Sequence, residues 1–287
     1  MRAVTLLFHD VVPTGRWDLS GFGGADADIY KLDCDTFRRH LTAISQSLHG
    51  SPTTGPDLLV GPSGRCPFLL TVDDGGVSAL LYSADILDEF GWKAHFFVTA
   101  GRIGTPGFLN RSQIQELRRR GHVIGSHSFS HPPRMALCST AQLDDEWQRS
   151  VLLLTEILAE PIRVASVPGG YYSREVALAA ARAGINLLFN SEPVTRSHFV
   201  DRCLVLGRFC AQRATPPDWS AAIVAGHWQP QMRTYLFWNA KKMAKTIGGT
   251  TWLRARVLLL ERRAQAQPPG GVEKIRARKG ISIRGSR

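Results

Sequence analysis

The stretch Phe68-Leu69-Leu70-Thr71-Val72-Asp73-Asp74-Gly75-Gly76 decides the fold class of this chain. An uncharged run that ends in two carboxylates and two glycines is typical of a buried parallel strand whose polar residues begin where the sheet ends. An Asp-Gly turn without any chemistry is the alternative interpretation of the pair taken alone. The stretch predicts a buried strand with Asp73 and Asp74 at its carboxyl end.

Similar apolar segments recur along the chain and alternate with helix signals. Seven strands are predicted, at Val4–Val11, Phe68–Val72, Ala94–Thr99, Val123–Ser126, Val164–Val167, Ile185–Phe189 and Leu204–Phe209. Between them, Ser139 with Gln142 forms a capping box, Ser173 precedes a helix that ends at Gly184, and Thr215-Pro216 starts one that ends at Gly226. These βαβ units predict an α/β fold, either a parallel barrel or a doubly wound sheet, with functional groups at the carboxyl ends of the strands.

The formal net charge of +11 arises in the last part of the 287-residue chain. Residues 232–287 contain 14 Lys or Arg and 2 acidic residues, and the rest of the chain is close to neutral. Because no nucleic-acid-binding motif accompanies this charge, we expect no specific nucleic-acid partner. We predict a catalytic barrel at residues 1–230 and a basic extension at 231–287, with partly apolar segments around Tyr235–Ile247 and Trp252–Arg263 before a disordered end.

The extension interleaves apolar residues with Lys and Arg, a mixture found in helices that lie on anionic lipid. The favoured alternative is a pair of helices that pack on the barrel and expose a basic face. The longest apolar runs are far shorter than the roughly 20 residues of a membrane span, and the first eight residues do not resemble a signal peptide. Five cysteines at irregular spacings indicate no disulfide framework. We therefore expect a cytoplasmic location, with peripheral membrane contact as an alternative, and a long surface loop at residues 49–67.

Two histidines follow the fourth predicted strand. His127 and His131 are separated by Ser128-Phe129-Ser130 and come directly after Val123–Ser126. Two imidazoles at this spacing can meet one ion if the segment turns, and Asp74 is expected at the same edge of the sheet. An H-x-x-x-H pattern alone has low specificity, but its position at a strand end strengthens it. Two His and one Asp with open positions are typical of a catalytic metal site.

Two further strand ends carry candidate site residues. The fifth strand runs into Pro168-Gly169-Gly170-Tyr171, where consecutive glycines would let backbone N–H groups approach a developing oxyanion. A simple turn is the alternative interpretation, and Tyr171 would either contact a substrate through its ring or pack. His9 and Asp10 close the first strand, so we expect them at the same rim, either supporting the site or substrate or capping a loop.

These motifs together resemble those of the polysaccharide deacetylases of carbohydrate esterase family 4. The segment Thr71 to Gly75 is similar to the family's Thr-Phe-Asp-Asp-Gly motif, and Ser126 to Pro132 is similar to its Ser-His-x-x-Ser-His-Pro motif. The resemblance covers about residues 1–225. It implies a distorted (β/α) barrel and a divalent metal ion, usually zinc.

The resemblance also implies roles for individual residues. Asp73 would be the catalytic base, and the metal ligands would be Asp74, His127 and His131. The turn Pro168–Gly170 would help to hold the oxyanion through a backbone amide.

Two departures from the family pattern concern proton transfer. Where the family often has an arginine that orients the base, two residues before Pro168, this chain has Ser166, with Arg163 nearby in sequence. The late Leu-x-His motif that supplies a general acid is not visible, because the region Cys203–Phe209 contains no histidine. His198 and His227 are candidates for a replacement acid, and a surface or structural role is the favoured interpretation of each.

The expected function is a metal-dependent hydrolase that removes N-acetyl groups from an N-acetylated sugar, polysaccharide or glycan precursor. The expected partner is that acetylated carbohydrate. A catalytically weak, metal-containing glycan-binding protein of the same fold is the alternative, because the general acid is missing from its usual place. Binding of nucleic acid through the basic extension is disfavoured.

Overall fold

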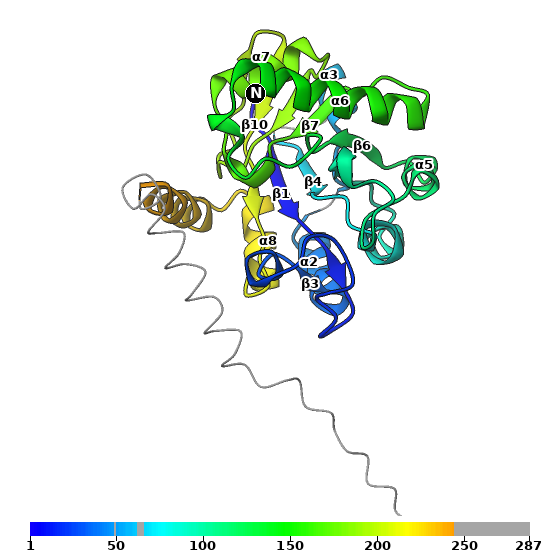
Figure 1. Cartoon of the computed structure of the whole chain (residues 1–287). Coiled ribbons are helices and arrows are strands. Elements are labelled where there is room, and N and C mark those ends of the chain that lie inside the picture. Colours follow the sequence, from blue (N-terminus) through cyan, green and yellow to red (C-terminus); the bar gives the residue numbers. More distant parts are fainter. Residues whose placement is uncertain (49, 62–65, 244–287) are drawn as a thin grey trace, which may run out of the picture.

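The computed structural model describes residues 1–48, 50–61 and 66–243. Within them, a curled sheet is surrounded by helices (Figure 1). The strands are β1 (Val4–Phe8), β2 (Val11–Val12), β3 (Leu32–Asp33), β4 (Phe68–Val72), β5 (His95–Val98), β6 (Val123–Ser126), β7 (Val164–Ser166), β8 (Leu187–Phe189), β9 (His198–Val200), β10 (Cys203–Leu206) and β11 (Phe209–Cys210). The helices are α1 (Ala25–Asp28), α2 (Cys34–Ser47), α3 (Gly55–Val60), α4 (Asp85–Glu89), α5 (Arg111–Arg119), α6 (Thr140–Leu158), α7 (Arg174–Arg182) and α8 (Pro217–Val224), with a π-helical turn at Ala79–Ala84 and 3-10 turns at Ala100–Arg102, Met135–Leu137 and Pro168–Gly170.

The predicted α/β architecture is confirmed. Among the described residues, the main sheet has nine strands in the order β11-β1-β4-β5-β6-β7-β8-β10-β9. All neighbours pair in parallel except β9, which runs antiparallel to β10. The sheet curls into a distorted half-barrel, so the carboxyl ends of its parallel strands converge on one rim.

The seventh predicted strand, Leu204–Phe209, is divided into two. β10 pairs with β8 and β11 pairs with β1, so consecutive segments of the chain lie on opposite sides of the sheet's opening. Only Gly207 and Arg208 join them. A Cβ atom on Gly207 would lie 2.3 Å from the carbonyl oxygen of Glu192, so the close approach at this bend requires glycine. The bend places Arg208 where the barrel comes nearest to closing.

The sheet separates two apolar cores. The larger core packs the outer face of the strands against α2, α4, α5, α6, α7 and α8, and it includes the fully buried Trp147. The smaller one fills the inside of the curl with alternate residues of the strands, such as Leu69, Phe97 and Phe189. This alternation lets short strands without charged side chains be buried on both faces.

The prediction of a continuous surface loop at residues 49–67 is wrong for its central part. Residues 55–60 form α3, because Thr54 caps the helix by accepting a hydrogen bond from the Asp57 N–H. Leu58 enters the inner core, and the Gly55 N–H donates to His95 Nε2 at 2.7 Å. The Pro- and Gly-rich composition hid a short helix that covers one end of the curl.

The predicted helix caps at Ser139 and Ser173 are confirmed. Ser139 and Gln142 form the reciprocal capping box of α6, and the Ser173 hydroxyl accepts a hydrogen bond from the first turn of α7. The helix predicted from Thr215-Pro216 begins at Pro217 and is followed by Gly226 with a positive φ of 80°.

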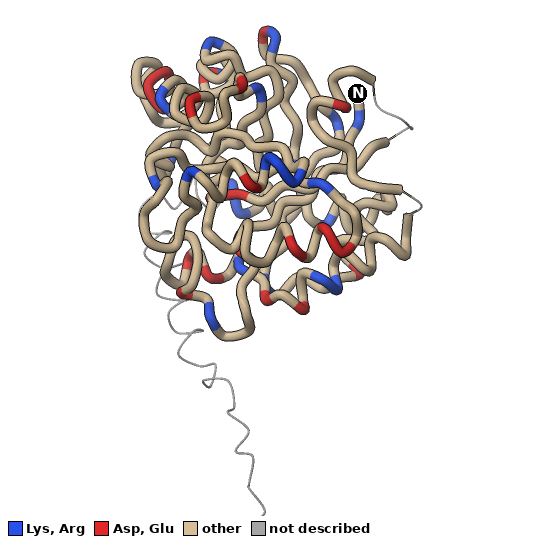
Figure 2. The backbone as a smooth tube through the Cα atoms, turned by 90° about the vertical axis from the view of Figure 1, so that its right-hand side faces the viewer, with Lys and Arg blue, Asp and Glu red and all other residues tan. Residues whose placement is uncertain are grey.

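The chain is helical again from residue 228 to 243, where the described part ends. This helix spans the predicted boundary at residue 230, and the division into two parts stays a prediction. The predicted segment Trp252–Arg263 and the predicted disordered end lie outside the described residues. No helix in the described part of the chain is long and apolar enough to cross a membrane. Over the body, basic and acidic residues are interspersed (Figure 2).

Candidate functional site

The candidate site lies at the rim formed by the carboxyl ends of β1, β4 and β6. Phe8 of β1 is in register with Val72 of β4, so the next residues, His9 and Asp73, begin the rim side by side. The Asp73 N–H donates to the Phe8 carbonyl, and the His127 N–H donates to the Val98 carbonyl of β5. Parallel pairing therefore brings residues far apart in sequence to one edge.

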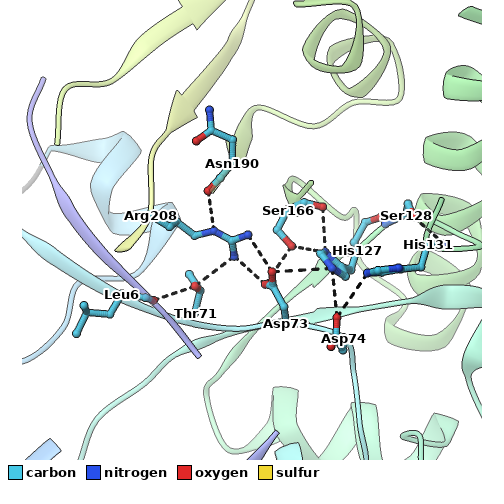
Figure 3. Close-up of polar contacts among 11 residues, drawn as sticks. Leu6, Thr71, Asp73, Asp74, His127, Ser128, His131, Ser166, Asn190 and Arg208 are labelled. Carbon is cyan, nitrogen blue, oxygen red and sulfur yellow. Dashed lines mark hydrogen bonds and ion pairs between the residues drawn. The ribbon is translucent and has the colours of Figure 1, made fainter. Parts of the chain in front are cut away.

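Asp74, His127 and His131 form a three-residue cluster at this rim. Their candidate ligand atoms all lie within 4.8 Å of one another. Asp74 Oδ1 is 3.5 Å from His127 Nε2 and 3.7 Å from His131 Nε2 (Figure 3). The fold thus brings together the three metal ligands that were predicted from the sequence. One carboxylate oxygen and two imidazole nitrogens face a common point.

The segment between the two histidines folds back through unusual backbone angles. Ser128 and His131 both have a φ of 61°, in the left-handed region. The Ser128 hydroxyl accepts a hydrogen bond from the His131 N–H. Glu146 of α6 accepts bonds from the Phe129 and Ser130 N–H groups and from the Ser130 hydroxyl. These bonds offset the cost of the strained angles and hold both imidazoles on one side of the turn.

The turn after β4 also depends on a left-handed backbone. Asp74 and Gly75 each have a φ of 78°, which turns the Asp74 carboxylate toward the histidines. A Cβ atom on Gly75 would lie 3.0 Å from the Val98 Cα atom, so the turn leaves little room for a side chain at that position. The glycine after Asp74 therefore permits the tight turn that places the Asp74 carboxylate at the rim.

The electrostatics of the cluster fit a divalent metal ion. The His127 Nδ1 atom lies 2.6 Å from the Ser166 hydroxyl and 3.1 Å from the Ser166 carbonyl, so Nε2 is left to face Asp74. Burial, together with the neighbouring His127, lowers the pKa of His131 to about 4 and keeps its imidazole neutral. Burial opposes ionisation of Asp74, but the surrounding histidines outweigh it and hold its pKa well below the usual value. A carboxylate and two imidazoles are a common catalytic donor set.

Asp73 lies beside this cluster in a buried ion pair with Arg208. The guanidinium Nη1 is 2.7 Å from Asp73 Oδ1, and Nη2 is 2.8 Å from Oδ2. Arg208 also donates to the Asn190 carbonyl and to the Thr71 hydroxyl. Burial raises the pKa of Asp73, but Arg208 and then His127 outweigh burial, and the net direction is downward. Asp73 is thus kept ionised and held in one orientation.

Arg208 is a site residue that the sequence prediction missed. Arg163, the arginine near Ser166 in sequence, is exposed at the amino end of β7 and donates to the Gly184 carbonyl. Ser166 lies beside the base, with its hydroxyl 3.2 Å from Asp73 Oδ1. The sequence signal that could have identified Arg208 is the triplet Leu206-Gly207-Arg208, which has an arginine where the family's Leu-x-His motif has histidine.

A cavity of about 750 Å³ opens above these residues. Of the predicted substrate residues, Gly169, Gly170 and Tyr171 line it, and so do His9 and Asp10. Pro168, the first residue of the turn, is buried and does not belong to the lining.

His9 and Asp10, the two residues after β1, have different surroundings. Asp10 accepts hydrogen bonds from the Ser20 and Ser78 hydroxyls at 2.6 and 2.7 Å, and burial together with Asp74 raises its pKa. The centroids of the His9 and Tyr30 rings are 4.9 Å apart, and the buried His9 Nδ1 has no hydrogen-bond partner among the described residues.

The two histidines considered as replacement acids, His198 and His227, lie away from the site. His198 is exposed on β9, where its Nε2 is 3.2 Å from the Tyr172 hydroxyl, and His227 is exposed after α8. Neither is among the residues that line the cavity.

Three residues of the C-terminal helix also line the cavity, which the sequence did not predict. They are Trp238, Lys241 and Lys242. Lys242 Nζ is 3.4 Å from a carboxylate oxygen of Glu192, another lining residue. The start of the basic extension is thus part of the cavity wall.

Residues 61–188 match the family model described as Polysaccharide deacetylase. The chain is 29% identical over 132 residues to YxkH of Bacillus subtilis (strain 168), a protein assigned by name to the polysaccharide deacetylases. That alignment covers 46% of this chain and 47% of the relative. A chitin deacetylase of Colletotrichum lindemuthianum is 32% identical over 107 residues, with 35% of this chain and 43% of the relative covered. The chain thus spans about half the length of the curated relatives it matches.

The fold is similar to that of a solved polysaccharide deacetylase from Bacillus cereus. The TM-score is 0.64 at 15% sequence identity, and the superposition covers 78% of this chain and 69% of the other. At this identity the likeness concerns the fold, a curled and mostly parallel sheet that forms a distorted half-barrel.

Proposed function

Because this chain belongs to the polysaccharide deacetylase family, we propose that it is a metal-dependent hydrolase that removes N-acetyl groups from an N-acetylated sugar, polysaccharide or glycan precursor. One observation carries the proposal: an Asp74-His127-His131 cluster lies beside a buried, ionised Asp73 on the wall of a 750 Å³ cavity. This arrangement has a place for a metal, a place for a base and room for a sugar.

Asp74, His127 and His131 would hold the ion. A divalent ion there would supply a Lewis acid for the acetyl carbonyl and would lower the pKa of an adjacent water. We propose zinc, because two imidazole nitrogens and one carboxylate oxygen with open positions suit it. The contact between Ser166 and His127 Nδ1 supports this role by fixing the ring orientation.

Asp73 would accept the proton of the attacking water. Its Oδ2 atom lies 3.9 Å from His127 Nε2, on the same side of the rim as the cluster. Arg208 binds both carboxylate oxygens, so the buried carboxylate keeps its charge and its orientation. Oδ1 also accepts a hydrogen bond from the Ser166 hydroxyl, so Oδ2 is the oxygen that retains a second lone-pair direction for the incoming proton.

The turn after β7 would hold the oxyanion and the sugar. Gly169 and Gly170 have φ values of 60° and 71°, and both line the cavity. Backbone without side chains at this place supports a close approach of a substrate carbonyl to N–H groups. Tyr171 and Tyr172 line the adjacent wall and offer aromatic faces to a pyranose ring.

His9 is our proposal for the proton donor to the leaving amine. Among the described residues, it is the only cavity-lining histidine outside the metal cluster. It follows β1, which pairs with β4, so it lies beside the Asp73 end of the site. A proton donor from β1 would replace the histidine that is absent at Arg208.

The alternative is a catalytically weak glycan-binding protein with the same metal site. The observation that favours it is the arginine at position 208, which pairs with the base and leaves the usual acid position without a titratable imidazole. Chemical turnover separates the two proposals.

The test is hydrolysis of a panel of N-acetylated sugars by the full chain. We expect acetate and free amine to appear in equal amounts from at least one member. Binding of sugars without release of either product would support the alternative. A cytoplasmic location is also proposed, on the five cysteines that form no disulfide in the structure, and fractionation of cells tests it.

A further inference from the structure

We propose that helix 228–243 is an interfacial helix that docks the protein onto an anionic lipid bilayer, with the cavity beside the membrane surface. The helix follows α8 and lies at the side of the body, coloured gold to orange in Figure 1. The docking surface is defined as Trp228, Met232, Tyr235, Leu236 and Met243. The docking proposal does not depend on the proposed reaction.

The docking surface is an apolar stripe, interrupted by Asn239 between Leu236 and Met243. Its five residues lie at positions i, i+4, i+7, i+8 and i+15, which place them on one face of an α-helix. Trp228 is 69% exposed, Leu236 59% and Met243 63%, and Met232 and Tyr235 are also exposed. Phe237 of the same helix is also exposed but lies off the stripe, where Lys241 Nζ is 4.2 Å from its ring centroid. Other large apolar residues that are exposed in the described chain, such as Leu81, Leu152 and Phe199, lie on separate elements. An apolar stripe of this kind marks an interaction surface.

The other side of the helix is fixed to the body. Trp219 of α8 donates through Nε1 to the Thr234 hydroxyl at 3.3 Å, and Gln231 donates to the Ile223 carbonyl at 3.1 Å. Trp238, on the same side, lines the cavity. Because these contacts fix the rotation of the helix about its axis, the stripe faces away from the body.

The charges of this region select an anionic partner. The helix contains Arg233, Lys241 and Lys242 and no acidic residue. The following residues, 244–287, add 11 Lys or Arg and only 2 acidic residues. This net positive charge attracts an anionic bilayer. Trp and Tyr beside aliphatic residues and lysines are the composition of helices that lie in a lipid interface.

The helix also connects the docking surface to the site. Its outer face carries the stripe, and its inner face supplies Trp238, Lys241 and Lys242 to the cavity wall. Docking would therefore place this wall, with its two cationic side chains, near the lipid headgroups. The substrate class that fits is an N-acetyl sugar anchored to the membrane through a phosphate, a consequence that rests on the proposed function.

The test is flotation of the full chain with vesicles of equal parts phosphatidylcholine and phosphatidylglycerol. We expect binding at low salt and release at high salt, because screening weakens the attraction of the basic residues. The double variant Met232→Gln, Leu236→Gln should lower the partition coefficient about tenfold or more, since two apolar side chains no longer enter the interface. The matched control Leu81→Gln, Leu152→Gln replaces two exposed leucines on other elements and should bind as the parent does.

Equal partitioning of the parent and the Met232→Gln, Leu236→Gln variant would overturn the proposal. Oxidative footprinting of Met232 and Met243 checks what covers the stripe, and we expect labelling in solution and protection on vesicles. Protection without vesicles would mean that residues 244–287 or a second copy cover the stripe, and would also overturn it.

Acetate release from a soluble N-acetyl sugar and from a vesicle-bound sugar phospholipid separates this inference from the proposed function. Turnover of the soluble sugar without vesicle binding would overturn the docking and leave the hydrolase. Vesicle binding without acetate from either substrate would overturn the hydrolase and leave the docking. If the protein both binds vesicles and releases acetate, the Met232→Gln, Leu236→Gln variant should lose turnover of the vesicle-bound substrate and keep turnover of the soluble sugar.

Discussion

Arg208 and Asp73 form a buried bidentate ion pair across the gap where the curled sheet comes nearest to closing, with N···O distances of 2.7 and 2.8 Å. Arg208 is fully buried and Asp73 is 3% exposed. The pair thus links the β10–β11 bend to the end of β4 and also holds the proposed catalytic base. Because one contact serves both closure and catalysis, its removal should affect stability and the pH profile together.

Replacing Arg208 with Met should raise the pKa of Asp73, because burial is then no longer opposed by the guanidinium. We expect the acid limb of the kcat/KM profile to move to higher pH and the free energy of unfolding to fall by about 3–5 kcal/mol. Arg163→Gln is the matched control and should change neither, since Arg163 is exposed and distant from the base. An unmoved acid limb in a folded Arg208→Met protein would show that Arg208 does not set the ionisation of the base.

Replacing both His127 and His131 with Ala should abolish stoichiometric metal binding, because only Asp74 of the cluster remains. Elemental analysis of the purified protein measures this. His198→Ala is the control, and it should bind one ion per chain as the parent does, because His198 lies outside the cavity. Equal metal content in the double variant and the parent would remove the proposed site.

Replacing Asp73 with Asn should preserve the ion and lower turnover, because an amide cannot accept the proton of the attacking water. Loss of a general base costs on the order of 100-fold to 10,000-fold. Turnover and metal content measured on the same preparation separate the two effects. A parental rate in this variant would exclude Asp73 as the base, and loss of the metal would place Asp73 among the ligands.

His9→Gln should slow hydrolysis of N-acetyl sugars by about 100-fold to 10,000-fold if His9 donates the proton to the leaving amine. Hydrolysis of 4-nitrophenyl acetate should fall much less, because a phenolate leaves without protonation. The comparison of the two substrates is therefore the measurement, and His198→Gln is the control. An equal fall with both substrates would assign His9 a structural role.

Three buried histidines should make folding stability depend on pH. Burial lowers the pKa of His40, His95 and His122 from 6.5 to about 4 in each case. Between these pH values the unfolded chain binds protons that the folded chain does not. Stability should therefore fall as the pH drops from 6.5 to 4, by on the order of 3 kcal/mol for each histidine, and should be insensitive to these groups above 6.5.

Chemical denaturation at several pH values measures that slope. His95 provides the specific check, because its Nε2 accepts the Gly55 N–H at 2.7 Å and its Nδ1 lies 3.0 Å from the Leu70 carbonyl. Glutamine lacks the titration, so His95→Gln should reduce the slope by about one proton in this pH range. An unchanged slope would mean that His95 does not contribute.

The strand ends and the metal cluster could be predicted from the sequence, because both follow from local patterns. Short uncharged runs predicted the buried strands, and parallel pairing then required that Asp74 and His127 share a rim. Only the curl of the sheet decides which residues from distant strands meet. Arg208 escaped prediction for that reason: the bend at Gly207 carries it from β10 to β1, which no local pattern indicates.

The helix α3 and the cavity wall from helix 228–243 were missed for different reasons. α3 is six residues long and lies in a segment rich in turn-forming residues, so its composition resembles a loop. The later helix was expected to be amphipathic, but the position of Trp238 in the cavity depends on tertiary contacts through Trp219 and Gln231.

The central claim is that this chain couples a metal ion at Asp74, His127 and His131 to hydrolysis of an N-acetyl group. The most direct measurement follows acetate release from an N-acetylated sugar by chelator-treated full-length protein during titration with zinc. The account predicts that acetate release rises in proportion to bound zinc and saturates at one ion per chain, and that Asp73→Asn binds the same zinc without comparable release. Full acetate release by metal-free protein, or one bound zinc per chain without release from any N-acetylated sugar tested, would contradict it.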